Sequence, residues 1–182
     1  MNMQLYKKVE QFVVDAFTKA EKSTDVFHAQ RTAYWITQLK PDADEALQIA
    51  GFAHDIERAF YGDWKKGSSD ADALRKHQDM SAAEITKFLR AEHASEELID
   101  RVSYLVAHHE EGGDVDQTVL CDADCLAYFE EKAVRNAKEK KQQGKNAEMI
   151  KKIDYVFSRI ASSKAREIAR PFYDEAMHIL RD

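Results

Sequence analysis

A histidine and an aspartate stand side by side at the end of an apolar run in this 182-residue chain. His54 and Asp55 follow segment 46–53, in which Gln48 is the only polar side chain. Burying an imidazole ring or a carboxylate costs free energy unless a partner compensates for it, and both groups are common metal ligands. The doublet therefore predicts a bound cation. Further ligand-type residues stand near helix ends or within a later helix: His28, His77, His108, His109, Asp122 and Asp124.

The composition of this set points to a class of metal. Imidazole and carboxylate together suit Fe, Mn, Co, Ni or Zn, whereas so many histidines argue against a pure Mg²⁺ or Ca²⁺ site. Four such side chains could hold one ion and six could hold two, with Asp55 placed beside His54 to bridge them. We therefore expect one or two divalent transition metal ions that polarise a phosphoryl oxygen and activate water.

Composition predicts an all-α fold in one domain. The chain is 44% hydrophobic and has only six Gly and two Pro, which favours helices over a sheet with many turns. A net charge of −6 argues against a nucleic-acid polymer as partner but allows a small phosphorylated substrate. The sequence shows no signal-peptide block and no run long enough to span a bilayer, which predicts a cytoplasmic protein without a membrane partner. A homo-oligomer is compatible with these features.

Apolar residues recur at helical spacing along most of the chain. The predicted helices cover 4–21, 26–40, a segment ending near Arg58, 80–92, a segment after Ser95, about 119–137, and one or two closing segments bent or broken at Pro171. His77 is expected just ahead of a helix start. His109 continues a buried stripe, whereas His108 lies about 100° around the helix and could be a ligand, a substrate contact or a surface residue. The two cysteines are expected in the core.

The ordered set resembles the HD-domain superfamily of metal-dependent phosphohydrolases. That family has a His near the start of one helix, a His-Asp doublet ending the next and a distant Asp, and its two-metal branches add two His between them. This chain has the same elements in the same order: His28 with Arg31, His54-Asp55, His77, His108-His109, and Asp124. The resemblance implies a single HD domain over 1–182, a bundle of about seven to eight helices with its core at about 5–135 and helices 146–182 packed on it.

The resemblance also implies roles for individual residues. His54 and Asp55 would be catalytic, in an enzyme whose metal-bound hydroxide attacks a nucleotide or another small phosphate ester, with Fe or Mn as the expected metal. The implied metal ligands are His28, His54, Asp55 and Asp124, completed by His77 with His108 or His109. Asp124 is preferred to Asp122 because Ala123-Asp124-Cys125-Leu126 matches the family's Ala-Asp-x-Leu. The implied phosphate-binding residues are Arg31, Arg58, Lys65 and Lys76.

Two departures from the family pattern leave other functions open. Ile56-Glu57-Arg58 follows the doublet where Gly-Lys is common, so Arg58 would replace that Lys. No Gly-Tyr-Pro follows His108-His109-Glu110, which argues against a cyclic dinucleotide substrate. A mixed-valent di-iron oxygenase could use the same six ligands, although such enzymes carry a Lys soon after the fourth His. A non-catalytic metal- or ligand-binding module is the third alternative.

Overall fold

The computed structural model describes residues 3–62 and 70–182, with side chains from Leu5 onwards, and these residues form an all-α fold as predicted. The helices are α1 (Met3–Lys19), α2 (Ser23–Leu39), α3 (Glu45–Ala53), α4 (Glu57–Tyr61), α5 (Ala71–Ala91), α6 (Glu96–Ala107), α7 (Val115–Tyr128), the π-helical segment η1 (Phe129–Ala133), α8 (Val134–Gln142), α9 (Asn146–Arg159) and α10 (Ser163–Arg181). Because α7, η1 and α8 are continuous, the described part holds eight helices of nine residues or more. Among the described residues, no helix has both the length and the apolar character needed to cross a bilayer.

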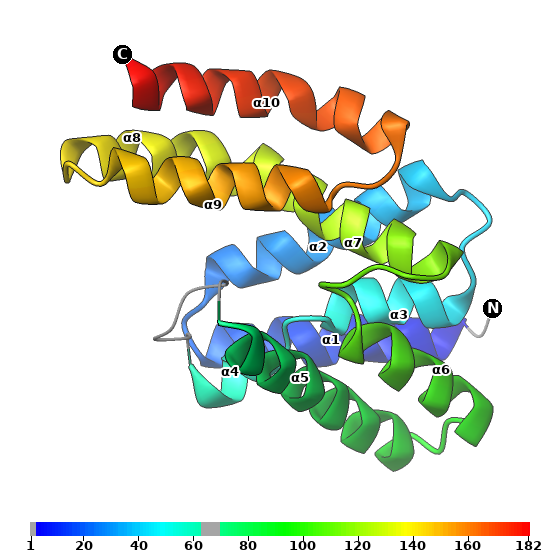
Figure 1. Ribbon diagram of the computed structural model, residues 1–182. Coiled ribbons are helices and arrows are strands. Elements are labelled where there is room, and N and C mark those ends of the chain that lie inside the picture. Colours follow the sequence, from blue (N-terminus) through cyan, green and yellow to red (C-terminus); the bar gives the residue numbers. More distant parts are fainter. Residues whose placement is uncertain (1–2, 63–69) are drawn as a thin grey trace.

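Two groups of helices pack against a central pair. In Figure 1, α1, α3, α5 and α6 lie on one side of α2 and α7, whereas α8, α9 and α10 lie on the other. Each side has its own cluster of buried apolar residues. Trp35 and Leu39 of α2 pack against both clusters, so α2 joins the two sides into one domain.

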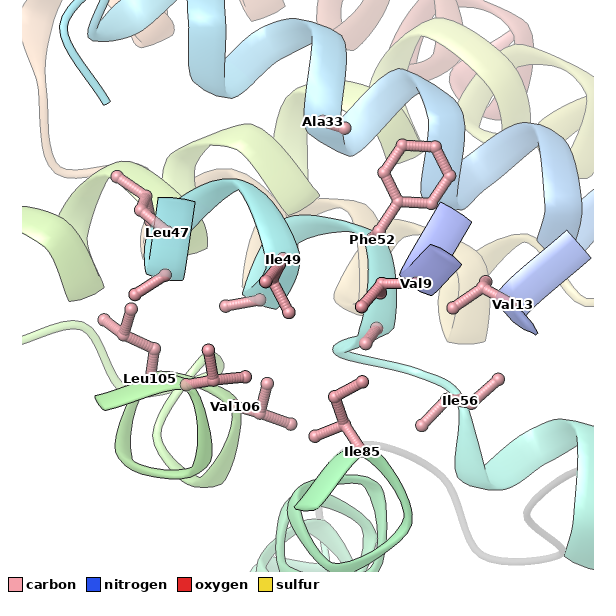
Figure 2. Packing of buried hydrophobic residues seen from close by; sticks show 14 of the residues in the cluster. Val9, Val13, Ala33, Leu47, Ile49, Phe52, Ile56, Ile85, Leu105 and Val106 are labelled. Atoms are coloured by element: carbon pink, nitrogen blue, oxygen red, sulfur yellow. The ribbon is translucent and has the colours of Figure 1, made fainter. Parts of the chain in front are cut away.

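Helix α3 lies at the centre of the first cluster. Leu47 and Ile49 are fully buried, and Figure 2 shows side chains from α1, α2, α5 and α6 surrounding this helix. Gly51 lets α3 approach α2 closely, because a Cβ at this position would lie 3.6 Å from the Ala33 Cα and would collide with the Ile36 side chain. This close approach brings the end of α3 next to the first turns of α2.

The second cluster is built on α7, η1 and the last three helices. Cys121 and Cys125 are buried free thiols within it, which confirms their predicted place in the core. The turn between α9 and α10 is fixed to α7, because Asp122 accepts hydrogen bonds from the backbone N–H groups of Ala161 (2.7 Å) and Ser162 (3.0 Å).

Three predicted helix limits were wrong. Helix α5 begins at Ala71, where Asp70 accepts a hydrogen bond from the Ala73 N–H, so His77 lies inside a helix and not ahead of one. Helix α3 ends at Ala53, and His54 follows in a turn before α4. Pro171 lies within α10, and the chain breaks earlier, at 160–162.

Candidate metal centre

Two groups of three ligand-type side chains lie inside the molecule. They come from α2, α5, α7, the turn between α3 and α4, and the turn after α6. All six residues are buried, with at most 8% of their surface exposed. Within each group the potential ligand atoms lie within 4.8 Å of one another. The first group is His28, His54 and Asp124, and the second is Asp55, His77 and His109.

The two groups adjoin at the His-Asp doublet. Asp55 Oδ1 lies 3.0 Å from His77 Nε2 and 3.9 Å from His109 Nε2, within the second group. Its other oxygen, Oδ2, lies 3.8 Å from His54 Nε2 in the first group. The Asp55 carboxylate thus presents one oxygen to each group, as expected of a bridging ligand.

The first group is centred on Asp124. Its Oδ1 lies 3.0 Å from His28 Nε2 and 3.5 Å from His54 Nε2. The sequence left a choice between Asp124 and Asp122, and the structure places only Asp124 in this group.

Hydrogen bonds outside the groups fix the orientation of two imidazole rings. His54 Nδ1 is 3.0 Å from the Gly51 carbonyl oxygen, and His109 Nδ1 is 2.8 Å from that of Val106. A carbonyl can only accept, so each Nδ1 carries the proton, and in the neutral ring Nε2 then keeps its lone pair.

Those lone pairs point towards carboxylates. Within the described residues, the Nε2 atoms of His54 and His109 are buried and form no hydrogen bond. A lone pair that faces a carboxylate in a buried site is unfavourable unless a proton or a metal cation lies between them. Burial opposes protonation of His54, but Asp55 and Asp124 raise its pKa above the usual value, and the same carboxylates would favour a bound cation. The donor set therefore fits a divalent transition metal, and each ring is anchored from behind as metal-bound histidines usually are.

Carboxylates lie behind the other two rings, and one of them forms a hydrogen bond. His77 Nδ1 lies 2.6 Å from Glu57 Oε1, and Ser81 donates a hydrogen bond to Glu57 Oε2. His28 Nδ1 lies 3.5 Å from a carboxylate oxygen of Glu131. The sequence prediction did not identify Glu57 or Glu131 in these roles.

The local charges keep the carboxylates ionised. Burial alone would raise the pKa of Asp124, but the hydrogen bond with His28, the nearby His54 ring and the charge of Arg159 hold it well below its usual range. Burial likewise opposes ionisation of Asp55, and the charges of Arg58 and His54 outweigh it, so that its pKa is also low. Metal ligands must be deprotonated, and both aspartates meet this condition.

The two histidines of the second group differ in pKa. Burial and the charges of His54 and His77 lower the pKa of His109, so this ring stays neutral. Burial lowers the pKa of His77 as well, but hydrogen bonds to Asp55 and Glu57 raise it to about 10. A metal ion would compete with that proton for the ring.

A cavity of about 150 Å³ opens beside the two groups. His28, Asp55 and Asp124 form one part of its wall. Four basic side chains form another part: Arg58 from α4, Lys132 from η1, and Lys152 and Arg159 from α9. The cavity therefore combines candidate metal ligands with cations that could hold an anionic substrate.

Other predicted site residues lie elsewhere. His108 caps α6 outside the groups, where its Nδ1 lies 2.8 Å from the Tyr104 carbonyl oxygen. Arg31 pairs with Glu130 at 2.8 Å and does not line the cavity. Lys76 is exposed on α5 and also lies outside the cavity wall. Lys65 lies outside the described residues.

The sequence prediction missed the basic residues of η1 and α9. Arg159 donates hydrogen bonds to the Glu110 backbone carbonyl and to Asp124, and it forms a 2.6 Å ion pair with the Glu110 carboxylate. One signal was present, because Lys152, Tyr155 and Arg159 follow at three and four residues beside the apolar stripe of α9. No comparable signal marks Lys132.

The chain matches a known protein family over most of its length. Residues 10–177 match the model of a family described as a domain of unknown function, DUF4202. Neither a curated protein nor a solved structure matches the chain.

Proposed function

The chain belongs to the DUF4202 family, and we propose that it is a metal-dependent phosphohydrolase acting on a nucleotide or another small phosphate ester. The observation that carries this proposal is the pair of His/Asp groups joined by Asp55 beside a cavity lined with four basic side chains. The resemblance of the ligand order to the HD-domain superfamily supports the same reaction class.

Each group would hold one ion. His28, His54 and Asp124 would bind the first, Asp55, His77 and His109 the second, and the two Asp55 oxygens face both positions. Divalent Fe or Mn bound there would polarise a phosphoryl oxygen and lower the pKa of a coordinated water.

The protein's own side chains would position the ligand carboxylates and the phosphoryl group. Arg58 Nη1 lies 2.8 Å from Asp55 Oδ2, and Arg159 Nη2 lies 3.2 Å from Asp124 Oδ2, so each guanidinium fixes one ligand carboxylate. The basic wall of the cavity would orient the phosphoryl group towards the ligands. Orientation of this kind is a large part of catalysis in phosphoryl transfer.

Elemental analysis followed by a phosphatase screen tests the proposal. We expect about two Fe or Mn ions per chain and phosphate release from at least one small ester by the reloaded protein. His54→Ala should lose metal and activity, because His54 belongs to the first group. His108→Ala is the matched control and should keep both, because His108 lies outside the groups.

Other results would point to other functions. Two bound irons with oxygen uptake, visible absorption bands and no phosphate release would favour the di-iron oxygenase, which could use the same six ligands. A protein that binds metal but turns over neither class of substrate would be a regulatory or sensing module. Absence of bound metal together with unchanged stability of His54→Ala would contradict all three functions.

A further inference from the structure

The four basic side chains of the cavity differ in what they contact. Both arginines are engaged by carboxylates of the candidate metal centre, Arg58 by Asp55 and Arg159 by Asp124. Arg159 has a second partner in Glu110. The arginines are therefore occupied in positioning other residues of the site.

The lysines have weaker partners. Lys132 Nζ lies 3.8 Å from carboxylate oxygens of both Asp25 and Glu131, which is too long for a hydrogen bond. Within residues 3–62 and 70–182, Lys152 forms no ion pair with a carboxylate at 4.0 Å or less. Both ammonium groups thus line the cavity, and neither forms a hydrogen bond with a carboxylate of the described residues.

The two lysines are shielded from water to different extents. Only 16% of the Lys132 side chain is exposed, and a charge so far removed from water needs a close partner. Lys152 is exposed at the mouth of the cavity, with its Nζ 5.5 Å from the centroid of the Tyr128 ring. Partial burial lowers the pKa of Lys152, and repulsion from Arg58 and Lys132 lowers it further.

Two helical features direct the lysines to the same cavity. Lys132 belongs to η1, the π-helical segment, and such segments occur frequently at functional sites. Lys152 lies on α9, seven residues before Arg159 and therefore on the same face of that helix. Helices from two parts of the chain thus converge on one anion-sized space.

We propose that Lys132 and Lys152 form the binding subsite for the terminal phosphate of a small phosphomonoester. This inference rests on the proposed phosphohydrolase function and narrows its substrate class. A phosphomonoester carries close to two negative charges near neutral pH, which matches two lysines, whereas a diester carries one. The cavity of about 150 Å³ is also smaller than the roughly 300–1,000 Å³ of pockets for drug-sized ligands, so it suits a phosphoryl group with a small organic part.

Binding of inorganic phosphate to the Mn²⁺-loaded full chain tests the subsite without requiring turnover. Titration calorimetry on Lys132→Gln and Lys152→Gln should each show affinity about tenfold or more below the unsubstituted protein. Lys151→Gln is the matched control, because Lys151 is the exposed neighbour on α9 and does not line the cavity. Metal content and thermal unfolding should be the same in all four proteins.

The same variants separate this inference from the hydrolase proposal. Phosphate binding that depends on both lysines, without release of phosphate from any ester, would support the subsite and refute the hydrolase. Hydrolysis with unchanged KM in both variants would support the hydrolase and refute the subsite. Equal phosphate affinity in all four proteins, or cleavage of diesters and not monoesters, would also overturn the subsite.

Discussion

Two aspartates on α7, only two residues apart, have different surroundings. Asp124 lies in the first ligand group, whereas Asp122 accepts hydrogen bonds from the Ala161 and Ser162 N–H groups in the turn before α10. Both are buried. The two aspartates therefore have different roles, because different elements pack against each side of α7.

Alanine at these two positions should separate metal binding from stability. We expect Asp124→Ala to lose bound metal, because it removes the carboxylate between His28 and His54. Asp122→Ala should keep metal and lower the free energy of unfolding by about 1 kcal/mol, because two backbone N–H groups of the turn before α10 lose their acceptor. Elemental analysis and urea unfolding of both variants measure the two effects. Metal loss confined to Asp122→Ala would show that the ligand is misassigned.

The sequence allowed a prediction of the ligand residues but not of those that support them. Six of the seven predicted ligands meet in the two groups, and His108 does not. Arg159 escaped prediction because it stands 35 residues from Asp124, on a different helix, and only packing of α9 brings the two together. Metal binding by the six residues of the two groups is a prediction that elemental analysis tests.

At the scale of elements, apolar periodicity located the helices but not all of their ends. The predicted start of α5 was too late because residues 71–76 include Asp72, Arg75 and Lys76 and carry no apolar stripe. A polar first turn can still be helical when a side chain caps its N-terminus, and Asp70 caps α5 in this way. Pro171 was predicted to bend or break the closing helices, but α10 continues through it.

An ionic contact joins three helical elements at the edge of the domain. Asp116, in the first turn of α7, forms ion pairs with Lys40 after α2 and with Arg101 of α6. Burial on its own would raise the pKa of Asp116, but hydrogen bonds from Lys40 and Arg101 lower it below the usual value. The folded state therefore favours the ionised form.

This contact predicts a pH-dependent stability difference. Because the pKa is lower in the folded state, the stabilisation is present above the unfolded-state pKa of about 3.9 and is lost as the pH falls through the folded-state value. Asp116→Asn should thus be less stable than the unsubstituted protein by about 1 kcal/mol at pH 7, and the difference should shrink towards pH 3. Urea unfolding at both pH values measures it. Asp100→Asn, at an exposed position of α6, is the control, and a difference that grows on acidification would contradict the assignment.

The whole molecule contributes to the candidate centre. The ligand groups lie where α2 and α7 meet the first set of helices, whereas Lys152 and Arg159 reach the cavity from α9 on the other side. The DUF4202 match, over 10–177, likewise spans both sides. Helices 146–182, predicted as an addition packed on a core, therefore supply part of the cavity wall.

Metal removal should consequently destabilise the entire domain. An ion that binds the folded chain and not the unfolded one stabilises it by about 2.7 kcal/mol at a hundredfold excess over Kd. Without metal, the buried His and Asp side chains, which come from segments distant in sequence, lose the cation between them. Chelation should therefore lower Tm, and the whole domain should still unfold in one cooperative transition. Calorimetric scans before and after chelation, with metal restored in a third sample, measure the shift. Asp124→Ala should shift less on chelation because its first ligand group is already incomplete, whereas an equal shift in the variant would place the stabilising metal elsewhere.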